Sequence, residues 1–195
     1  MSMGFEHVRE GRITIDRIQH LEEILEHSVI QTFHSQTQSS VYVKRNDIQR
    51  TIHDSMRRAL MAGPGSSLRC HYGRRNGQST AVAMYVAAYA KAFPGGKIAI
   101  NCSTPGSGRV TAEYILEQAL NLGAVVTMSP FCIFYGDVLG ATITFDRNDI
   151  RGPCPQGHDL LLGDYWDHIA IAIGSDEPEE SLLGYVNKTR GLSYM

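Results

Sequence analysis

The sequence lacks the features that mark several protein classes. Its 195 residues include only four cysteines, which are widely spread and form no CxxC pair, so a reduced intracellular compartment is expected rather than a disulfide framework. No apolar run is long enough to cross a membrane, and the first residues lack the apolar core of a signal peptide. The net charge is only −2, so no global basic field indicates nucleic-acid binding, although a local basic patch stays open.

The composition is that of a globular protein with one core. Hydrophobic residues make up 43% of the chain and charged residues 19%, values typical of a folded domain of this length. Residues 1–62 are predicted to form a helical N-terminal segment that packs on an α/β core of residues 63–195. One helix is expected from Thr14 or Asp16 to about Phe33, and a second from Asn46 or Asp47 to about Met61, with a short extended piece at 40–43.

Beyond the Gly-Pro-Gly turn at 63–65, strand-like and helix-like segments alternate. Strands are expected at 68–72, 97–102, 124–128, 140–145 and 159–164, and helices at 79–92 and 110–122, while 169–173 is ambiguous. This alternation predicts a three-layer α/β sandwich with a central, mainly parallel sheet covered on both faces. Ligands of such sheets sit beyond the carboxyl ends of the strands.

The stretch 68–80 has the layout of a phosphate-binding loop. A strand enters a loop with two glycines, and a Ser-Thr pair then opens a helix, whose free N–H groups and dipole favour an anion. The ordinary alternative is a strand-to-helix turn in which Ser or Thr is an N-cap. The predicted nucleotide-binding residues are Gly73, Arg74, Arg75, Asn76, Gly77, Gln78, Ser79 and Thr80.

Gln78 is the main departure from the standard Gly-Lys-Ser/Thr pattern. A glutamine amide offers two neutral donors and no charge, so about half the strength of a charge-assisted bond is lost. Arg74 and Arg75 lie in the same loop and could restore the charge, because arginine is permanently protonated and suits phosphate. The alternative is that both arginines are solvated loop residues.

Asp164 follows an apolar strand directly. In a nucleotide site, an acid in this position holds Mg²⁺ while a loop hydroxyl, here Ser79 or Thr80, binds the metal. Asp167 is the nearest second carboxylate that could orient an attacking water, since Tyr165 cannot accept a proton from water at neutral pH. The alternative is that Asp164 caps a helix that starts at Tyr165.

Taken together, these segments resemble the ATPase domain of the large terminase subunits, the DNA-packaging motors of tailed phages and herpesviruses. The resemblance covers about residues 47–167 and includes the loop Gly73–Thr80, the strand 98–103 and the approach to Asp164. It implies a P-loop NTPase of the additional-strand catalytic-glutamate type, in which Arg74 contacts the terminal phosphate and Asp164 and Ser79 hold the metal.

The resemblance also implies cofactors and partners. ATP and Mg²⁺ would be bound, with Arg74 and Asp167 as catalytic residues, and the partners would be double-stranded DNA, a portal, a small terminase subunit and a nuclease domain or chain. A homo-oligomeric ring in the host cytoplasm, without a membrane, is expected.

Three departures from the family pattern leave two hypotheses open. The loop lysine is missing, Tyr165 stands where a glutamate is expected, and the chain ends before a nuclease domain would fit. The chain is therefore either a packaging ATPase domain with a deviant loop or a catalytically inactive, P-loop-derived binding or scaffold module.

Overall fold

The computed structural model of the protein describes residues 13–34, 39–63, 65–71, 77–146, 158–165 and 168–174. Helices and strands are mixed along the chain, as the α/β prediction requires. In order they are α1 Ile15–His27, β1 Ile30–His34, β2 Ser39–Val43, α2 Asp47–Ala62, β3 Ser67–His71, α3 Gln78–Ala92, β4 Lys97–Cys102, α4 Pro105–Asn121, β5 Val125–Met128, β6 Phe131–Phe134, β7 Ala141–Asp146, β8 Leu160–Asp164 and β9 His168–Ile173.

Seven strands form one open sheet in the order β3-β9-β8-β4-β7-β6-β5. Only the pairings of β4 with β8 and of β4 with β7 are parallel, and the four other pairings are antiparallel. The prediction of a mainly parallel sheet is therefore wrong. The connections explain this, because residues 165–167 between β8 and β9 are too few for the crossover that parallel neighbours need, and they allow only a hairpin.

The core lies on one face of this sheet. Ile98, Ile100, Leu160 and Leu162 point to the side on which α1, α2, α3 and α4 contribute to a single hydrophobic cluster. The alternate residues of these strands and of β9 face the other side of the sheet, where Ala99, Leu161, Ala170 and Ala172 form a smaller cluster. Among the described residues, the helices thus cover one face and not two, which corrects the expected sandwich with a central sheet.

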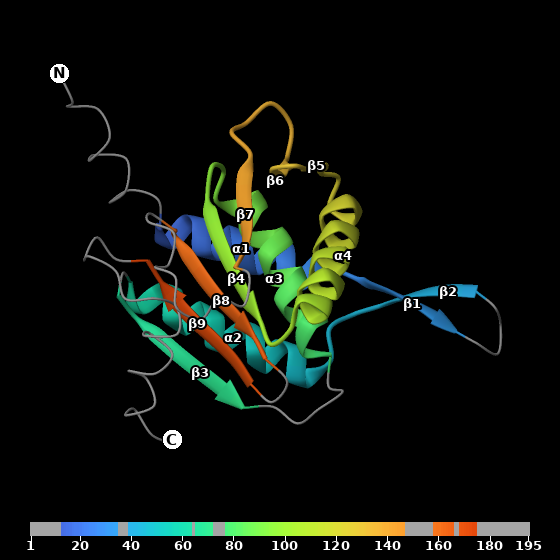
Figure 1. Cartoon of the computed structure of the whole chain (residues 1–195), viewed down its shortest axis with the longest axis horizontal. Coiled ribbons are helices and arrows are strands. Elements are labelled where there is room, and N and C mark those ends of the chain that lie inside the picture. The colour runs from blue at the N-terminus through green and yellow to red at the C-terminus, as the bar shows by residue number, and fades with distance from the viewer. Residues whose placement is uncertain are drawn as a thin grey trace.

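Helix α3 is the central helix of this layer. Almost all of its residues are buried, including both faces of the run Ala81–Ala90. A helix that is apolar all round is buried on all sides, and here the sheet covers one side while α1, α2 and α4 pack around the rest (Figure 1). Side chains of α1 or α2 that contact α3 therefore reach the hydrophobic core.

The N-terminal region follows the sequence prediction in part. Thr14 caps α1 and Asn46 caps α2 through a capping box, each the first of the two N-cap candidates expected for its helix. However, α1 ends at His27, and the segment predicted to extend it to Phe33 instead forms β1, which pairs with β2 in an antiparallel hairpin. This hairpin projects from the body of the protein (Figure 1).

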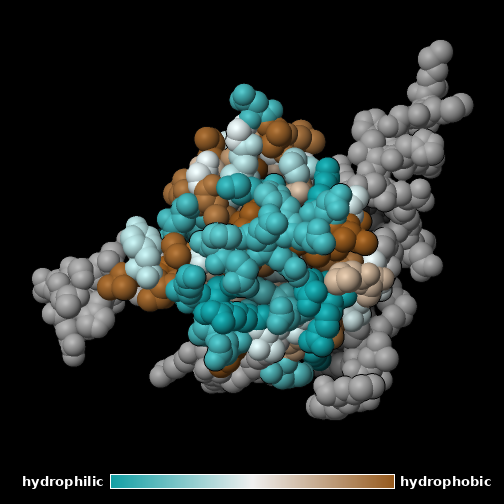
Figure 2. All heavy atoms as spheres, turned by 180° about the vertical axis from the view of Figure 1, so that it is seen from behind, coloured by the Kyte–Doolittle hydropathy of each residue, from teal (hydrophilic) through white to brown (hydrophobic). Residues whose placement is uncertain are grey.

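Figure 2 shows the molecule from behind, where the surface is mainly hydrophilic across its centre. Hydrophobic residues are exposed on the hairpin, at Val41, Tyr42 and Val43. Within the described residues, no helix combines the length and the apolar character that crossing a membrane requires.

Candidate functional site

The acid at the end of β8 lies in a buried, hydrogen-bonded position. Asp164 is only 5% exposed, and its Oδ2 accepts a hydrogen bond of 2.8 Å from the hydroxyl of Thr111 on α4. The hydroxyl of Ser79, in the first turn of α3, lies close enough to the Asp164 carboxyl group to act on its pKa. Three elements that are distant in sequence therefore meet at this carboxylate.

The topology explains why they meet. β3 and β8 flank β9 and are both antiparallel to it, so their carboxyl ends lie at the same edge of the sheet. β4 runs parallel to β8 and also ends there, with Cys102 beside Asp164. Helices α3 and α4 follow β3 and β4, so both helices begin at this edge, where ligands of α/β sheets commonly bind.

The start of α3 is shaped by Gly77. This residue is the N-cap, with a φ of 77°, a left-handed conformation that glycine adopts at little steric cost. A glycine N-cap has no side chain that could accept from the first N–H groups of the helix. The sequence alternative, in which Ser79 or Thr80 is the N-cap, is therefore wrong, because both residues lie inside the helix.

Burial governs the electrostatics of the site. It raises the pKa of the Asp164 carboxyl group, an effect that the hydrogen bonds from Thr111 and Ser79 partly offset. The thiol of Cys102 donates to Thr111 Oγ1 at 3.9 Å, and burial together with the nearby Asp164 charge raises its pKa to about 11. The thiol is therefore protonated at neutral pH, and Asp164 is the group that can carry negative charge here.

Thr111 is a site residue that the sequence analysis missed. It is 1% exposed and occupies the same face of α4 as the core residues Ile115 and Ala119. Thr111 lies inside the helix expected at 110–122, but it was not predicted to lie on the buried face of that helix. A hydroxyl on an otherwise apolar helical stripe was the available signal, because a buried hydroxyl needs a partner.

The structure also corrects the alternative interpretation of Asp164. Tyr165 is not helical, and the next described element is the strand β9, so Asp164 does not cap a helix at this position. The ring of Tyr165 lies against Gly163, where an added Cβ would overlap it, and packs on the small cluster with Ala99 and Leu161. It faces away from the hydroxyls that contact Asp164.

Gln78 is buried at the position where a loop lysine would be expected. It is 8% exposed, and its Nε2 has no hydrogen-bond partner among the residues that the structure describes. The neighbouring backbone is held by α2, because Gln49 Nε2 donates to the carbonyl of Gly77 at 3.4 Å. The first turn of α3 is thus fixed from behind by α2.

Several predicted site residues cannot be placed. Gly73, Arg74, Arg75, Asn76 and Asp167 lie outside the described residues. Of the predicted set, the structure brings together Ser79 and Asp164, with Gly77, Gln78 and Thr80 in the same turn.

The donor set suits a hard cation only with further ligands. Within the described residues no group of three or more His, Cys, Asp or Glu side chains could hold a metal ion. One carboxylate with neighbouring hydroxyls nonetheless fits Mg²⁺, which takes oxygen ligands and keeps several waters or substrate phosphates. Comparison of the chain with protein-family models and with curated protein sequences found no match.

Proposed function

We propose that the chain binds a Mg²⁺–nucleoside triphosphate at the start of α3 and serves as the ATPase domain of a terminase-like DNA-packaging motor. The observation that carries this proposal is the proximity of Ser79 to Asp164, close enough for its hydroxyl to lower the pKa of the carboxyl group against the effect of burial. It joins the helix that follows the glycine loop to the acid that ends an apolar strand. These are the two groups with which P-loop NTPases hold their metal ion.

The strand order gives further support. β9 lies between β3, which enters the loop, and β8, which carries the acid, and the resemblance implies a sheet with an additional strand. The direction of β9 departs from a parallel arrangement, because it is antiparallel to both neighbours. The order therefore supports a P-loop-like arrangement more than the direction does.

Each residue has a role in the proposed site. Asp164 and Ser79 would hold Mg²⁺, which would supply positive charge to the phosphates, and the free N–H groups of the first turn of α3 would bind phosphate oxygens. Arg74 would contact the terminal phosphate, and Asp167 would orient water. The partners of the motor would be double-stranded DNA and the other packaging proteins, in an oligomeric ring.

Gln78 favours a second candidate, a P-loop-derived module that binds nucleotide without turnover. Its amide is buried and uncharged, so among the described residues nothing at this position replaces the charge of a loop lysine. In this case the protein would act as a binding or scaffold module within a packaging assembly.

One assay separates the two candidates. The protein is titrated with ATP in Mg²⁺, and phosphate release is then followed with and without duplex DNA. Release that Arg74→Ala abolishes supports the motor, whereas saturable binding without release supports the scaffold. We expect Asp164→Asn to weaken Mg²⁺-dependent binding at least tenfold, in the range of one lost charge-assisted contact.

A matched control is available in Asp137→Asn, which removes a carboxylate from an exposed turn. Nucleotide binding that both variants leave equal to the wild type would rule out the site around Asp164. We also expect Gln78→Lys to raise nucleotide affinity, because a lysine adds a full charge. Weaker or unchanged binding would count against the placement of the phosphate loop.

A further inference from the structure

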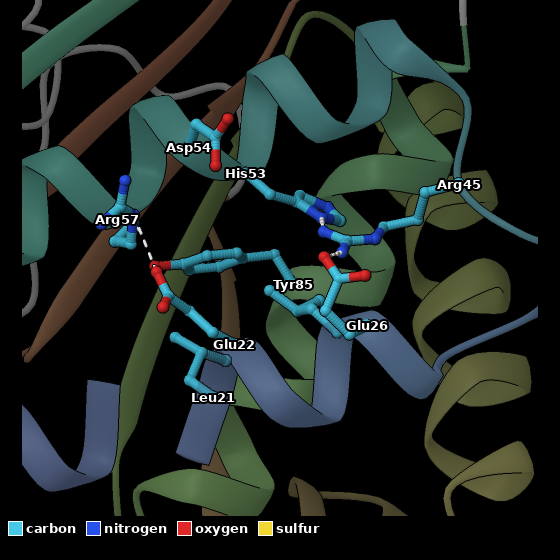
Figure 3. Close-up of a pocket in the computed structure, with 9 residues that line it drawn as sticks. Leu21, Glu22, Glu26, Arg45, His53, Asp54, Arg57 and Tyr85 are labelled. Carbon is cyan, nitrogen blue, oxygen red and sulfur yellow. Dashed lines mark hydrogen bonds and ion pairs between the residues drawn. The ribbon is translucent and has the colours of Figure 1, made fainter. Parts of the chain in front are cut away.

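A second polar site lies between α1, α2 and α3, beside Tyr85 (Figure 3). It is a slot of about 290 Å³, which is near the lower end of the volumes of small-molecule pockets. Tyr85 lies about two turns along α3 from Ser79. The slot is thus separate from the site around Asp164, and nothing proposed above uses it.

Two ion pairs flank the slot, and each joins α1 to α2 or its approach. Arg57 Nε lies 2.7 Å from Glu22 Oε1, and Arg45 Nη2 pairs with Glu26 Oε1. Figure 3 shows the pairs at opposite sides of the Tyr85 ring. Both arginines therefore already have a carboxylate partner, and an anionic ligand would have to displace it.

The floor of the slot contains a hydroxyl group without a partner. Tyr85 is fully buried, and its Oη has no hydrogen-bond partner among the described residues. Burial raises the pKa of this phenol well above its usual value, so it is neutral and can both donate and accept. Since a buried hydroxyl without a partner is costly, the geometry indicates that a polar group from a ligand belongs next to it.

The charge of the lining favours a cation. Arg45 and Arg57 are outnumbered by the carboxylates of Glu22, Glu26 and Asp54. The remaining titratable side chain, His53, is neutral, because burial lowers its pKa to about 3. The lining therefore has one surplus negative charge. A carboxylate ligand would be repelled, whereas an ammonium group would be attracted.

The rest of the lining is apolar. Leu21 and Leu25 of α1 contribute to the slot and are 1% and 3% exposed. An aliphatic chain packed on these side chains loses its contact with water, which favours binding. The site therefore combines an apolar wall, an acceptor oxygen and a negative surplus.

We propose that this slot binds a small primary alkylammonium ion, whose ammonium group donates to Tyr85 Oη near the carboxylates of Glu22 and Asp54 and whose chain packs on the leucines of α1. The proposal does not depend on nucleotide binding. It predicts selectivity for charge, since a carboxylate or an alcohol of the same length has the same chain but not the positive group.

The test uses n-butylammonium, n-butyrate and n-butanol, titrated into the full chain and followed by NMR chemical-shift changes. We expect saturable binding of butylammonium, at least tenfold weaker binding of butanol, and no saturable binding of butyrate, since one charge-assisted hydrogen bond is worth about tenfold or more. Butyrate that binds as well as butylammonium, or no saturation with any of the three, would overturn the proposal.

Variants locate the binding within the slot. Tyr85→Phe keeps the ring and removes the acceptor, and it is expected to weaken butylammonium binding about tenfold. Asp54→Asn removes an exposed carboxylate from the rim and is expected to weaken binding about threefold. Asp137→Asn, a carboxylate outside the slot, should leave binding unchanged. Equal affinities for all four proteins would place the ligand elsewhere, and Asp54→Asn tests this even if Tyr85→Phe fails to fold.

Discussion

Two buried polar clusters contact α3, and they are built in different ways. At the start of the helix, Asp164 is a single carboxylate held by the neutral hydroxyls of Thr111 and Ser79. On its flank, the slot beside Tyr85 is flanked by two arginine–glutamate pairs and contains a hydroxyl without a described partner. The first cluster has an acid without a cationic partner among the described residues, and the second has two ion pairs around a phenol without a described partner.

The difference determines which kind of ligand each cluster can bind. Hydroxyls are weak partners for a buried carboxylate, so a cation that reached Asp164 would gain much of the interaction that the hydroxyls cannot supply. In the slot two of the three carboxylates are paired with arginines, and a cationic ligand gains from the phenol, the apolar wall and the one surplus negative charge. Burial lowers the pKa of His53 in the slot and raises the pKa of Asp164. The two clusters should therefore change the stability of the protein with pH in opposite directions, and this is the largest effect that tests the comparison.

Acid is expected to destabilise the protein through His53. Its Nε2–H donates to the carbonyl of Ala81 at 2.8 Å and its Nδ1 accepts from Arg45 at 2.9 Å, and burial lowers its pKa from 6.5 to about 3. The unfolded chain therefore binds more protons between these values, so stability is complete above pH 6.5 and is lost as the pH falls toward 3. We expect a loss of about 2 to 3 kcal/mol between pH 6.5 and 4.5 in urea unfolding.

The control is His53→Gln, whose unfolding free energy should vary less over this range.

Asp164 is expected to change stability with pH in the opposite direction. Its folded-state pKa is raised above 3.8, so the stability that it contributes is present below pH 3.8 and is lost as the pH rises through the raised value. Asp164→Asn should therefore gain stability relative to the wild type as the pH rises. Curves that run parallel for all three proteins would contradict both assignments.

Thr111→Val is expected to cost about 2 kcal/mol, because it leaves a buried Asp164 oxygen without its donor while keeping the volume of the side chain. The cost should be larger at neutral than at acidic pH, since a hydrogen bond to a charged acceptor is about twice as strong as a neutral one. Thr111→Ser keeps the hydroxyl and serves as the matched control for guanidinium unfolding. A loss in Thr111→Ser that equals that of Thr111→Val would mean that the methyl group, rather than the hydroxyl, matters.

These residues also show what the sequence could predict. Most elements were found because helical and strand periodicities were strong, as in α2 and β4, and the meeting of Ser79 with Asp164 follows from the placement of both at strand ends. The pairing direction was not accessible, because the run 169–173 fits a strand or a helix equally well. Once this run is a strand, the short connection from β8 allows only the antiparallel hairpin that the structure shows.

The slot beside Tyr85 was beyond the sequence analysis for a different reason. Its charged residues occupy the polar faces of α1 and α2, where charges are ordinarily solvated. Arg45 is buried only because α1 and α2 pack against each other over α3, with Glu26 and His53 around it. Long-range packing of this kind leaves no local pattern.

Gly77→Ala is expected to cost about 1 to 2 kcal/mol, since the residue has a left-handed φ that an alanine adopts with strain. The new Cβ would also lie 2.7 Å from Gln49 Nε2, so the glutamine side chain must move and its bond to the Gly77 carbonyl is lost. Gly63→Ala is the matched control, because Gly63 has a φ of 85° and nothing within 4 Å of an added Cβ. A thermal-unfolding loss that is greater for Gly77→Ala isolates the contact with α2.

The smallest effect is expected at the exposed side of the slot. Arg57 and Glu22 are 39% and 42% exposed, so a double-mutant cycle with Arg57→Met and Glu22→Gln should give a coupling of only about 0.5 kcal/mol, which falls in high salt. The same cycle at Arg45 and Glu26 should give a larger coupling that salt affects less, because the Arg45 side chain is only 7% exposed. Equal couplings would mean that Glu26, which is 68% exposed, adds no more to its arginine than a surface partner does. In that case His53, rather than Glu26, would hold Arg45 in the slot.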